Sequence, residues 1–358
     1  MRVLLLLLLL HALPALACPG CMPVALTFVE EVEMAGAVAL ARPMPEAKSR
    51  FRLERIFKGE AQAGKVVAAA AAGSPGLVVL TTAAEPANPF WTGKPRPADE
   101  DVIHFVAQAV ELPSRFQANS LKPRLDFLQP YLGHANLLLA DAAYGEFSQA
   151  PYVDLMPYAR SIGSARLRTL ISRPTTPITH LSLYYMLLGM LGQPADLDLI
   201  EPRVQKAAKQ TSPPGNLSAL LTCYLHLKRS AGLPYLEKAF LKGRPAHRFA
   251  ALSALGIHGN NKSPLTRGDI SKIYRNYIGD VQAGTFVLQD LALWGDWSVL
   301  EQVGTVFRRK PEDVRLRVAV IRYLRTCPQP RARDILQELH KIDPSLVNAV
   351  RRPFTPNP

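Results

Sequence analysis

The chain has 358 residues, of which 48% are hydrophobic and 20% are charged. This composition excludes an intrinsically disordered protein, because there is ample apolar material for a core and little charge to keep the chain solvated. The formal net charge is +13, which favours anionic partners over cationic ones.

The first segment, residues 1–17, predicts a signal peptide. Arg2 supplies a positive charge, residues 3–10 form an unbroken apolar run, and residues 15–17 (Ala-Leu-Ala) give the small-x-small pattern of a cleavage site. No later apolar run approaches the ~18 residues that a membrane-spanning helix needs. We therefore predict an exported protein, periplasmic or extracellular.

Four cysteines follow: Cys18, Cys21, Cys223 and Cys327. In an oxidising compartment Cys18 and Cys21 are candidates for a local disulfide. The leader ends in Ala-Leu-Ala-Cys, which partly resembles a lipobox, so a lipoprotein is the alternative and membrane attachment is expected only if Cys18 is acylated. Cys223 lies in an apolar helical pattern typical of a buried thiol, and its pairing with Cys327 stays open.

About 340 residues remain after the leader, which predicts two domains. In residues 18–115, short apolar runs alternate with Gly- and Pro-rich turns, and residues 27–34 predict a helix. This pattern indicates a small antiparallel β-barrel or sandwich. The predicted strands are residues 37–40, 51–57, 65–70, 77–81 and 102–106.

Residues 125–345 have a helical period, with Gly and Pro punctuation between segments and nothing strand-like. The first helices of successive pairs begin near residues 183, 219, 248, 287 and 314, a spacing typical of helix-pair repeats. We therefore predict an α+β chain in which the β domain precedes an all-α HEAT-like solenoid and a C-terminal tail, residues 346–358. The predicted helices are residues 126–139, 181–191, 217–228, 233–241, 248–257, 269–278, 286–293, 299–307, 314–324 and 331–339.

The excess charge lies in residues 201–358, which contain 25 Lys and Arg against 12 Asp and Glu. This basic half predicts an envelope protein or an anionic polymer as partner, although scattered arginines also suit a plain solvated surface. The sequence contains no specific nucleic-acid motif.

Three stretches resemble a family of uncharacterised exported bacterial proteins with HEAT-like repeats, and the similarity spans nearly the whole mature chain. They are residues 51–59 (FRLERIFKG), 141–152 (DAAYGEFSQAPY) and 290–297 (DLALWGDW). The resemblance implies export and architecture, and it brings no catalytic residue.

The N-terminal part alone also resembles the netrin-like OB barrel of metalloproteinase inhibitors, whose mature chain begins with a zinc-chelating cysteine. Cleavage after Ala17 would place Cys18 at that position. The spacing here is Cys-x-x-Cys where the inhibitors have Cys-x-Cys, so the resemblance implies the fold and not inhibition.

Asp141, Tyr144 and Glu146 form one acidic and aromatic segment. Paired carboxylates are what glycoside hydrolysis requires, so an envelope enzyme acting on glycan or cell-wall polymer is our alternative function. Packing of the aromatic rings and pairing of the acids with arginine is the simpler interpretation.

Trp294 and Trp297 flank Gly295-Asp296, a pattern that predicts a helix end at Gly295 and a capping role for Asp296. The two indoles are candidates for stacking on sugar rings or for packing in a core. His226 lies one turn from Cys223, but a second pair of zinc ligands is absent, so no metal or cofactor is predicted.

No hydrolase, metalloprotease, nucleotide-binding or calcium-binding signature occurs in the sequence. The sequence thus predicts an exported, non-catalytic binding or scaffold protein of the cell envelope.

Overall fold

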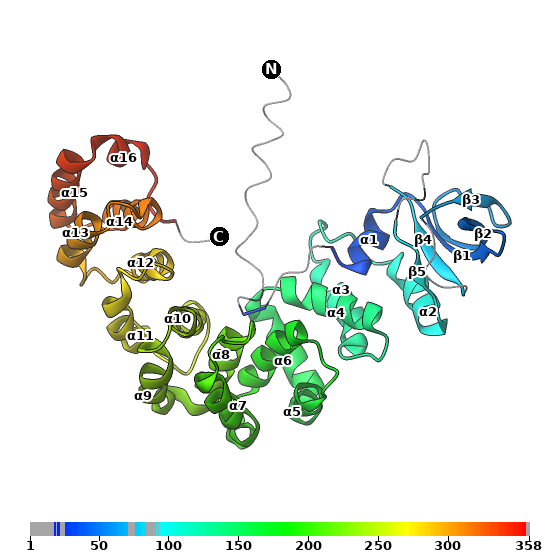
Figure 1. Cartoon of the computed structure of the whole chain (residues 1–358), viewed down its shortest axis with the longest axis horizontal. Helices are drawn as coiled ribbons and strands as arrows, with labels where there is room; N and C mark the ends of the chain where they lie inside the picture. Colours follow the sequence, from blue (N-terminus) through cyan, green and yellow to red (C-terminus); the bar gives the residue numbers. More distant parts are fainter. Residues whose placement is uncertain are drawn as a thin grey trace. The chain divides into compact units, whose positions relative to one another are not determined.

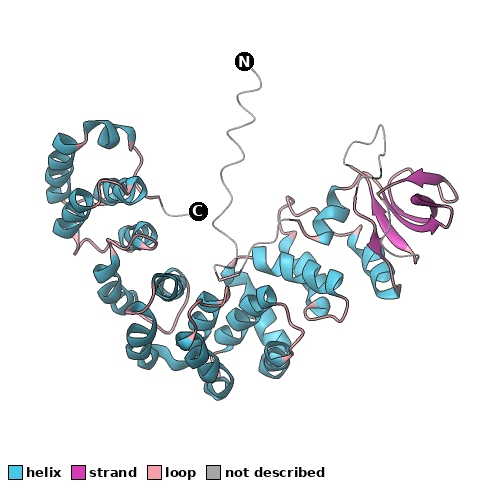
Figure 2. Cartoon of the chain, in the orientation of Figure 1, coloured by secondary structure: helices cyan, strands magenta, loops and turns pink. Residues whose placement is uncertain are grey.

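The computed structural model describes residues 18, 20–21, 26–70, 76–83, 91 and 93–355. The predicted signal peptide lies outside the described residues. The chain divides into two compact units: the sheet unit, residues 23–150, and the helical unit, residues 1–22 and 151–358. The described strands all belong to the sheet unit (Figure 2), which confirms an α+β fold with a helical C-terminal part.

The strands form one antiparallel sheet of order β3-β2-β1-β4-β5. Over the described residues this sheet is open, with β3 and β5 at its edges, so the predicted barrel is not confirmed. The strands are β1 Val38–Met44, β2 Ala47–Lys58, β3 Val66–Ala68, β4 Val78–Thr81 and β5 Arg96–Pro97.

Strand β2 shows why the sheet has one buried face. Phe51 and Leu53 are buried, whereas the alternating residues Arg50, Arg52 and Glu54 are exposed, as the two-residue period of a strand requires. A two-residue turn joins β1 to β2, since Met44 pairs with Ala47. The buried face packs the core cluster of Ala37, Ala39, Ala41, Phe51, Leu53, Val78, Leu80 and Trp91.

Two helices accompany the sheet, and one of them corrects a sequence prediction. Helix α1, Phe28–Met34, lies within the predicted residues 27–34, and Thr27 caps its first turn in a capping box. Residues 102–106, predicted as a strand, belong instead to α2, Glu100–Ala109, whose first turn is capped by the Asp99 side chain. The segment VIHFV reads as a strand in isolation, but burial of Val102, Phe105, Val106 and Ala109 follows the helical period.

The helix predicted at residues 126–139 is also wrong, because the chain breaks there. Helix α3, Leu121–Leu128, gives way to a short 3₁₀ turn that contains Pro130, and α4, Leu137–Gln149, begins after Asn136. Gly133 between them has a φ of 73°, a left-handed conformation that glycine adopts without strain. Both helices belong to the sheet unit.

The helical unit places α8, α10, α12 and α14 in succession along one side and α9, α11 and α13 along the other (Figure 1). Along this row α6 packs extensively against α8, α8 against α10 and α12 against α14, whereas α10 and α12 share a smaller contact. The predicted helix at residues 217–228 matches α8 at both ends. The α-helices are α5 Met156–Ser172, α6 Ile178–Leu191, α7 Leu197–Lys209, α8 Leu217–Lys228, α9 Leu233–Leu236, α10 Pro245–Asn260, α11 Arg267–Tyr274, α12 Gly284–Leu293, α13 Leu300–Arg309, α14 Val314–Thr326, α15 Pro330–Ile342 and α16 Pro344–Ala349.

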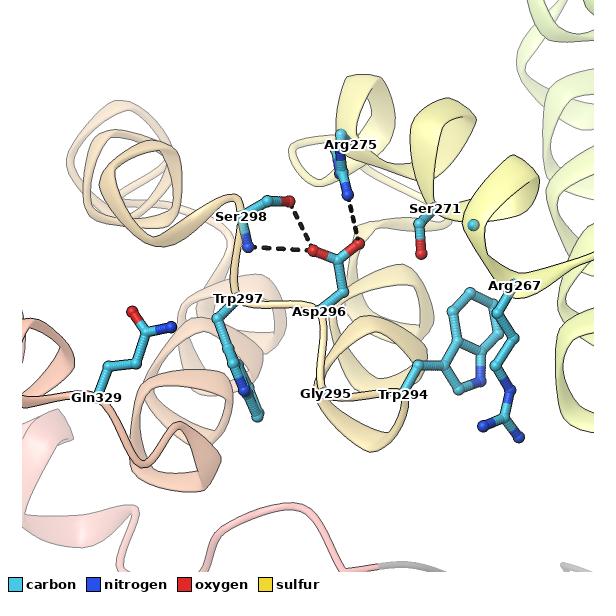
Figure 3. A pocket seen from close by; sticks show the side chains of 10 residues that line it. Arg267, Ser271, Arg275, Trp294, Gly295, Asp296, Trp297, Ser298 and Gln329 are labelled. Carbon is cyan, nitrogen blue, oxygen red and sulfur yellow. Dashed lines mark hydrogen bonds and ion pairs between the residues drawn. The ribbon is translucent and has the colours of Figure 1, made fainter.

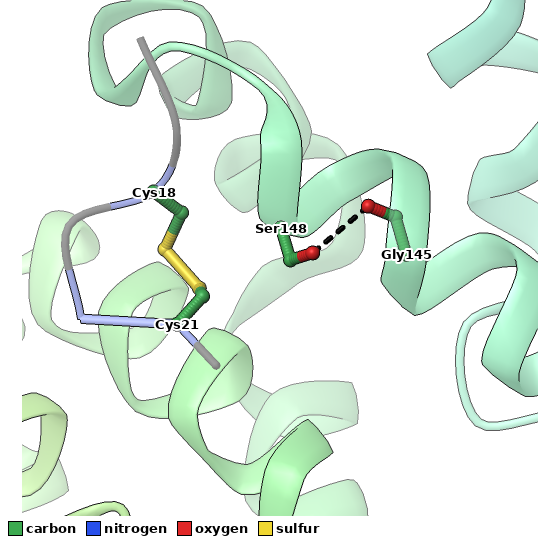
Figure 4. Close-up of a disulfide and its surroundings, with 4 residues drawn as sticks. All are labelled: Cys18, Cys21, Gly145 and Ser148. Atoms are coloured by element: carbon green, nitrogen blue, oxygen red, sulfur yellow. Dashed lines mark hydrogen bonds between the residues drawn. A yellow bond between two sulfur atoms is a disulfide. The ribbon is translucent and has the colours of Figure 1, made fainter. Parts of the chain in front are cut away.

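Cys18 and Cys21 are joined by a disulfide (Figure 4), as predicted. Cys223 and Cys327 are both buried free thiols, and burial raises the pKa of Cys223 well above its usual value. Within the described part of the chain, every helix is too short or too polar to cross a membrane.

Candidate functional site

The predicted acidic segment lies on α4 of the sheet unit and is only partly buried. Tyr144 and Glu146 are buried in α4, whereas Asp141 on the same helix is exposed. The two carboxylates therefore do not face one surface, and neither of them lines a pocket of the helical unit.

Glu146 is held by a buried arginine of α3. Arg124 Nη2 and Nε donate to the two carboxylate oxygens of Glu146 at 2.7 and 3.0 Å, and Nη1 donates to Glu33 Oε2 at 2.7 Å. Burial alone would lower the pKa of Arg124, but hydrogen bonds and charges from the two glutamates outweigh it and raise that pKa. The guanidinium thus stays charged and ties α1, α3 and α4 together.

Trp294 and Trp297 lie at a pocket of about 490 Å³ in the helical unit (Figure 3). We call it the tryptophan pocket. It combines two indoles with cationic, hydroxyl and amide groups. Its lining residues are Arg267, Gly268, Ser271, Arg275, Trp294, Gly295, Asp296, Trp297, Ser298 and Gln329.

The turn between α12 and α13 presents the two indoles. Gly295 has a φ of 73° and ends α12, as predicted. The Asp296 carboxylate accepts hydrogen bonds from the Ser298 N–H and hydroxyl at 3.1 and 2.6 Å. Helix α13 begins only after Val299, so Asp296 caps this connecting turn and not the helix itself.

Tyr274 and Asn260 fix the orientation of Trp294. Its indole stacks on Tyr274, with ring centroids 5.4 Å apart and planes 17° from parallel. Its Nε1 donates to Asn260 Oδ1 at 2.8 Å, and Asn260 Nδ2 donates to Asp290 Oδ1 at 2.9 Å. Asp290 is buried, and burial raises its pKa to about 6.

Gly259 makes room for this indole on α10. A Cβ at Gly259 would lie 2.2 Å from Trp294 Cζ2. We expect Gly259→Ala to displace Trp294 and to destabilise the chain by about 1–3 kcal/mol, the usual cost of overpacking. Urea unfolding and the tryptophan emission maximum measure the two effects.

A matched control lies nearby in α11. A Cβ at Gly268 would approach only Thr266 Oγ1, at 3.7 Å, so Gly268→Ala should be neutral or stabilising by up to about 1 kcal/mol. Equal behaviour of the two variants would contradict the packing argument.

The charges of the pocket are partly paired. Arg275 Nη2 lies 2.9 Å from Asp296 Oδ2. Burial tends to raise the pKa of Asp296, but hydrogen bonds from Ser298 and Arg275 outweigh it and lower that pKa. Arg267 lies over the Trp294 ring, 6.0 Å from its centroid, and its Nε donates to the Gly259 carbonyl at 2.9 Å.

A second, larger pocket of about 970 Å³ lies along the amino-terminal ends of α10, α12 and α14. We call it the apolar groove after Phe249, Val281 and Val314, which are 42%, 71% and 54% exposed. The polar and charged residues that also line it are Gln282, Thr285, Lys310, Glu312, Asp313 and Arg315. Large apolar side chains gathered at one exposed groove are typical of a protein-binding surface. This groove could not be predicted from the sequence, since the three residues come from three separate segments.

The partly buried His226 and the buried His258 form a pair that sequence reasoning missed. His226 Nε2 hydrogen-bonds the Tyr152 hydroxyl at 2.7 Å, and its ring lies 4.5 Å from that of His258. His258 Nε2 donates to the Thr222 carbonyl, so its Nδ1 accepts from Ser263 Oγ at 2.7 Å. The Ser263 hydroxyl and the His258 ring resemble a nucleophile and its base, but burial lowers the pKa of His258 to about 3, which makes this histidine a poor base.

Among the described residues, no group of three or more His, Cys, Asp or Glu side chains is placed to hold a metal ion. Comparison of the chain with family models, curated proteins and solved structures finds no match.

Proposed function

We propose that the chain is an exported, non-catalytic binding protein of the cell envelope whose helical unit, interpreted as a HEAT-like solenoid, binds a protein partner. The apolar groove is the observation that carries this proposal. A partner that covers these three exposed apolar side chains would be bound more tightly, because each Å² of apolar surface removed from water lowers the free energy of the complex by ~25 cal/mol. A solenoid offers the extended surface that such binding uses.

A charge placed in the groove tests this proposal. Val281→Glu should reduce capture of the specific partner from envelope extracts by about tenfold or more, because the carboxylate would have to be desolvated in the complex. Val153→Glu is the matched control, since Val153 is 69% exposed against 71% for Val281 and lies outside the groove. Equal capture by both variants would contradict the proposal.

Export is part of the same proposal and rests on residues 1–17 and the Cys18–Cys21 disulfide. The intact mass of the chain purified from its native envelope tests it. A chain that begins at an unmodified Cys18 supports a secreted protein, acylated Cys18 supports a lipoprotein, and a chain that retains Met1 contradicts leader cleavage.

We do not extend the proposal to glycan hydrolysis by Asp141 and Glu146. Both carboxylate oxygens of Glu146 accept hydrogen bonds from Arg124 in the interior of the sheet unit, which leaves no proton donor or nucleophile at the surface from this residue.

A further inference from the structure

We propose that the tryptophan pocket binds a carboxylate-bearing sugar ring of an acidic glycan. This site is separate from the apolar groove and does not depend on the protein partner proposed above. Its volume of about 490 Å³ falls in the range of pockets that hold one small ligand or one unit of a polymer.

The pocket lacks the groups expected of a protein-binding groove. No Leu, Ile, Val, Met or Phe is among the residues that line it, whereas Phe249, Val281 and Val314 line the apolar groove. Its apolar surface comes from Trp294 and Trp297 alone. An indole face is electrostatically negative and attracts the C–H bonds on the flat side of a sugar ring.

Trp294 is held in place before any ligand arrives. Tyr274 supports one face of its indole, Asn260 accepts its N–H, and the missing side chain at Gly259 lets it seat against α10. A ring fixed in this way loses little side-chain entropy on binding, so more of the contact energy is expressed as affinity.

Arg267 supplies the charge that an acidic sugar would meet. Arg275 is occupied by Asp296, whereas Arg267 forms no ion pair within the described residues. Its Nε donates to the Gly259 carbonyl, which holds the guanidinium over the Trp294 ring, 6.0 Å from the ring centroid (Figure 3). The terminal nitrogens suit a carboxylate, and Ser271 and Gln329 offer hydrogen bonds to sugar hydroxyls.

Calorimetric titration of the full chain with a galacturonic acid trimer tests the proposal, with the methyl-esterified trimer as matched ligand. The ester keeps the rings and hydroxyls and replaces each negatively charged carboxylate by a neutral methyl ester. We expect the acid to bind at least about tenfold more tightly than the ester, the difference that a charged hydrogen bond makes. Because this comparison uses the wild-type chain, it does not depend on the folding of any variant.

Variants then locate the site. Arg267→Gln should abolish the difference between acid and ester, and Lys262→Gln, an exposed cation outside the pocket, should preserve it. Equal losses in both variants would indicate non-specific attraction to a basic surface and would overturn the proposal. Absence of binding by the acid, equal binding of acid and ester, or an equally tight, Arg267-dependent complex with a glutamate oligopeptide or a nucleotide would also overturn it.

Discussion

Arg124→Met should destabilise the sheet unit by about 3–5 kcal/mol, because it leaves the buried carboxylate of Glu146 without its counter-charge and removes an ion pair from the partly buried Glu33. The Arg124 side chain is 2% exposed, and it is the ion-pair partner of both Glu33 and Glu146. Urea unfolding gives the loss of stability. Faster hydrogen exchange across α4 would show that the loss arises in this unit.

Two further variants show whether the loss of stability comes from an unpaired buried charge or simply from removing an arginine. Arg42→Met removes an exposed arginine of the same unit that pairs with Glu54, and it should cost less than about 1 kcal/mol. Adding Glu33→Gln and Glu146→Gln to Arg124→Met should recover part of the lost stability, since no unpaired charge then stays buried. A small effect of Arg124→Met would contradict the structural role assigned to Glu146.

Between pH 6 and pH 5 the stability of the helical unit should fall by about 1.4 kcal/mol. Burial lowers the pKa of His226 to about 4 and of His258 to about 3, from 6.5 in an unfolded chain. In this window the unfolded chain therefore binds two protons that the folded chain does not. Asp290 acts in the opposite sense, because its pKa is raised to about 6 and the folded chain holds its proton.

The two kinds of group can be separated by mutation. His258→Gln should bring the slope close to zero, because one remaining histidine balances Asp290, and Asp290→Asn should double the slope. His340→Gln, at an exposed histidine, should leave it unchanged. Urea unfolding at pH 5, 5.5 and 6 measures the slopes; Asp99, Asp198, Asp296 and Glu301 have lowered pKa values and add losses only at lower pH.

Much of the fold was predictable because local patterns decide it. The period of α8 and the cap at Thr27 are readable within a dozen residues. The errors fell where a short segment satisfies two patterns, as in α2, or where two residues suffice for a strand, as in β5. Closure of the sheet depends on which edges meet, and alternation along single strands does not specify that.

Only the two tryptophans of the candidate site were predictable from the sequence. Trp294 and Trp297 were visible as an aromatic pair around a glycine. The groups that orient Trp294 lie far away in sequence: Gly259 and Asn260 come from α10 and Tyr274 from α11. Likewise Arg124 and Glu33 are 91 positions apart. Such pairings are set by tertiary packing, and a single sequence carries no record of them.

The order of packing within each unit has a consequence for how the chain is made. In the helical unit the main packing partner of each α-helix is close to it in the sequence, so this unit can condense progressively as it is synthesised. The sheet unit is synthesised earlier, but its folding needs contacts between residues far apart in the sequence. Glu33 on α1 cannot form its ion pair with Arg124 until α3 has been synthesised. The first helix of this unit therefore stays exposed to proteases and chaperones until then.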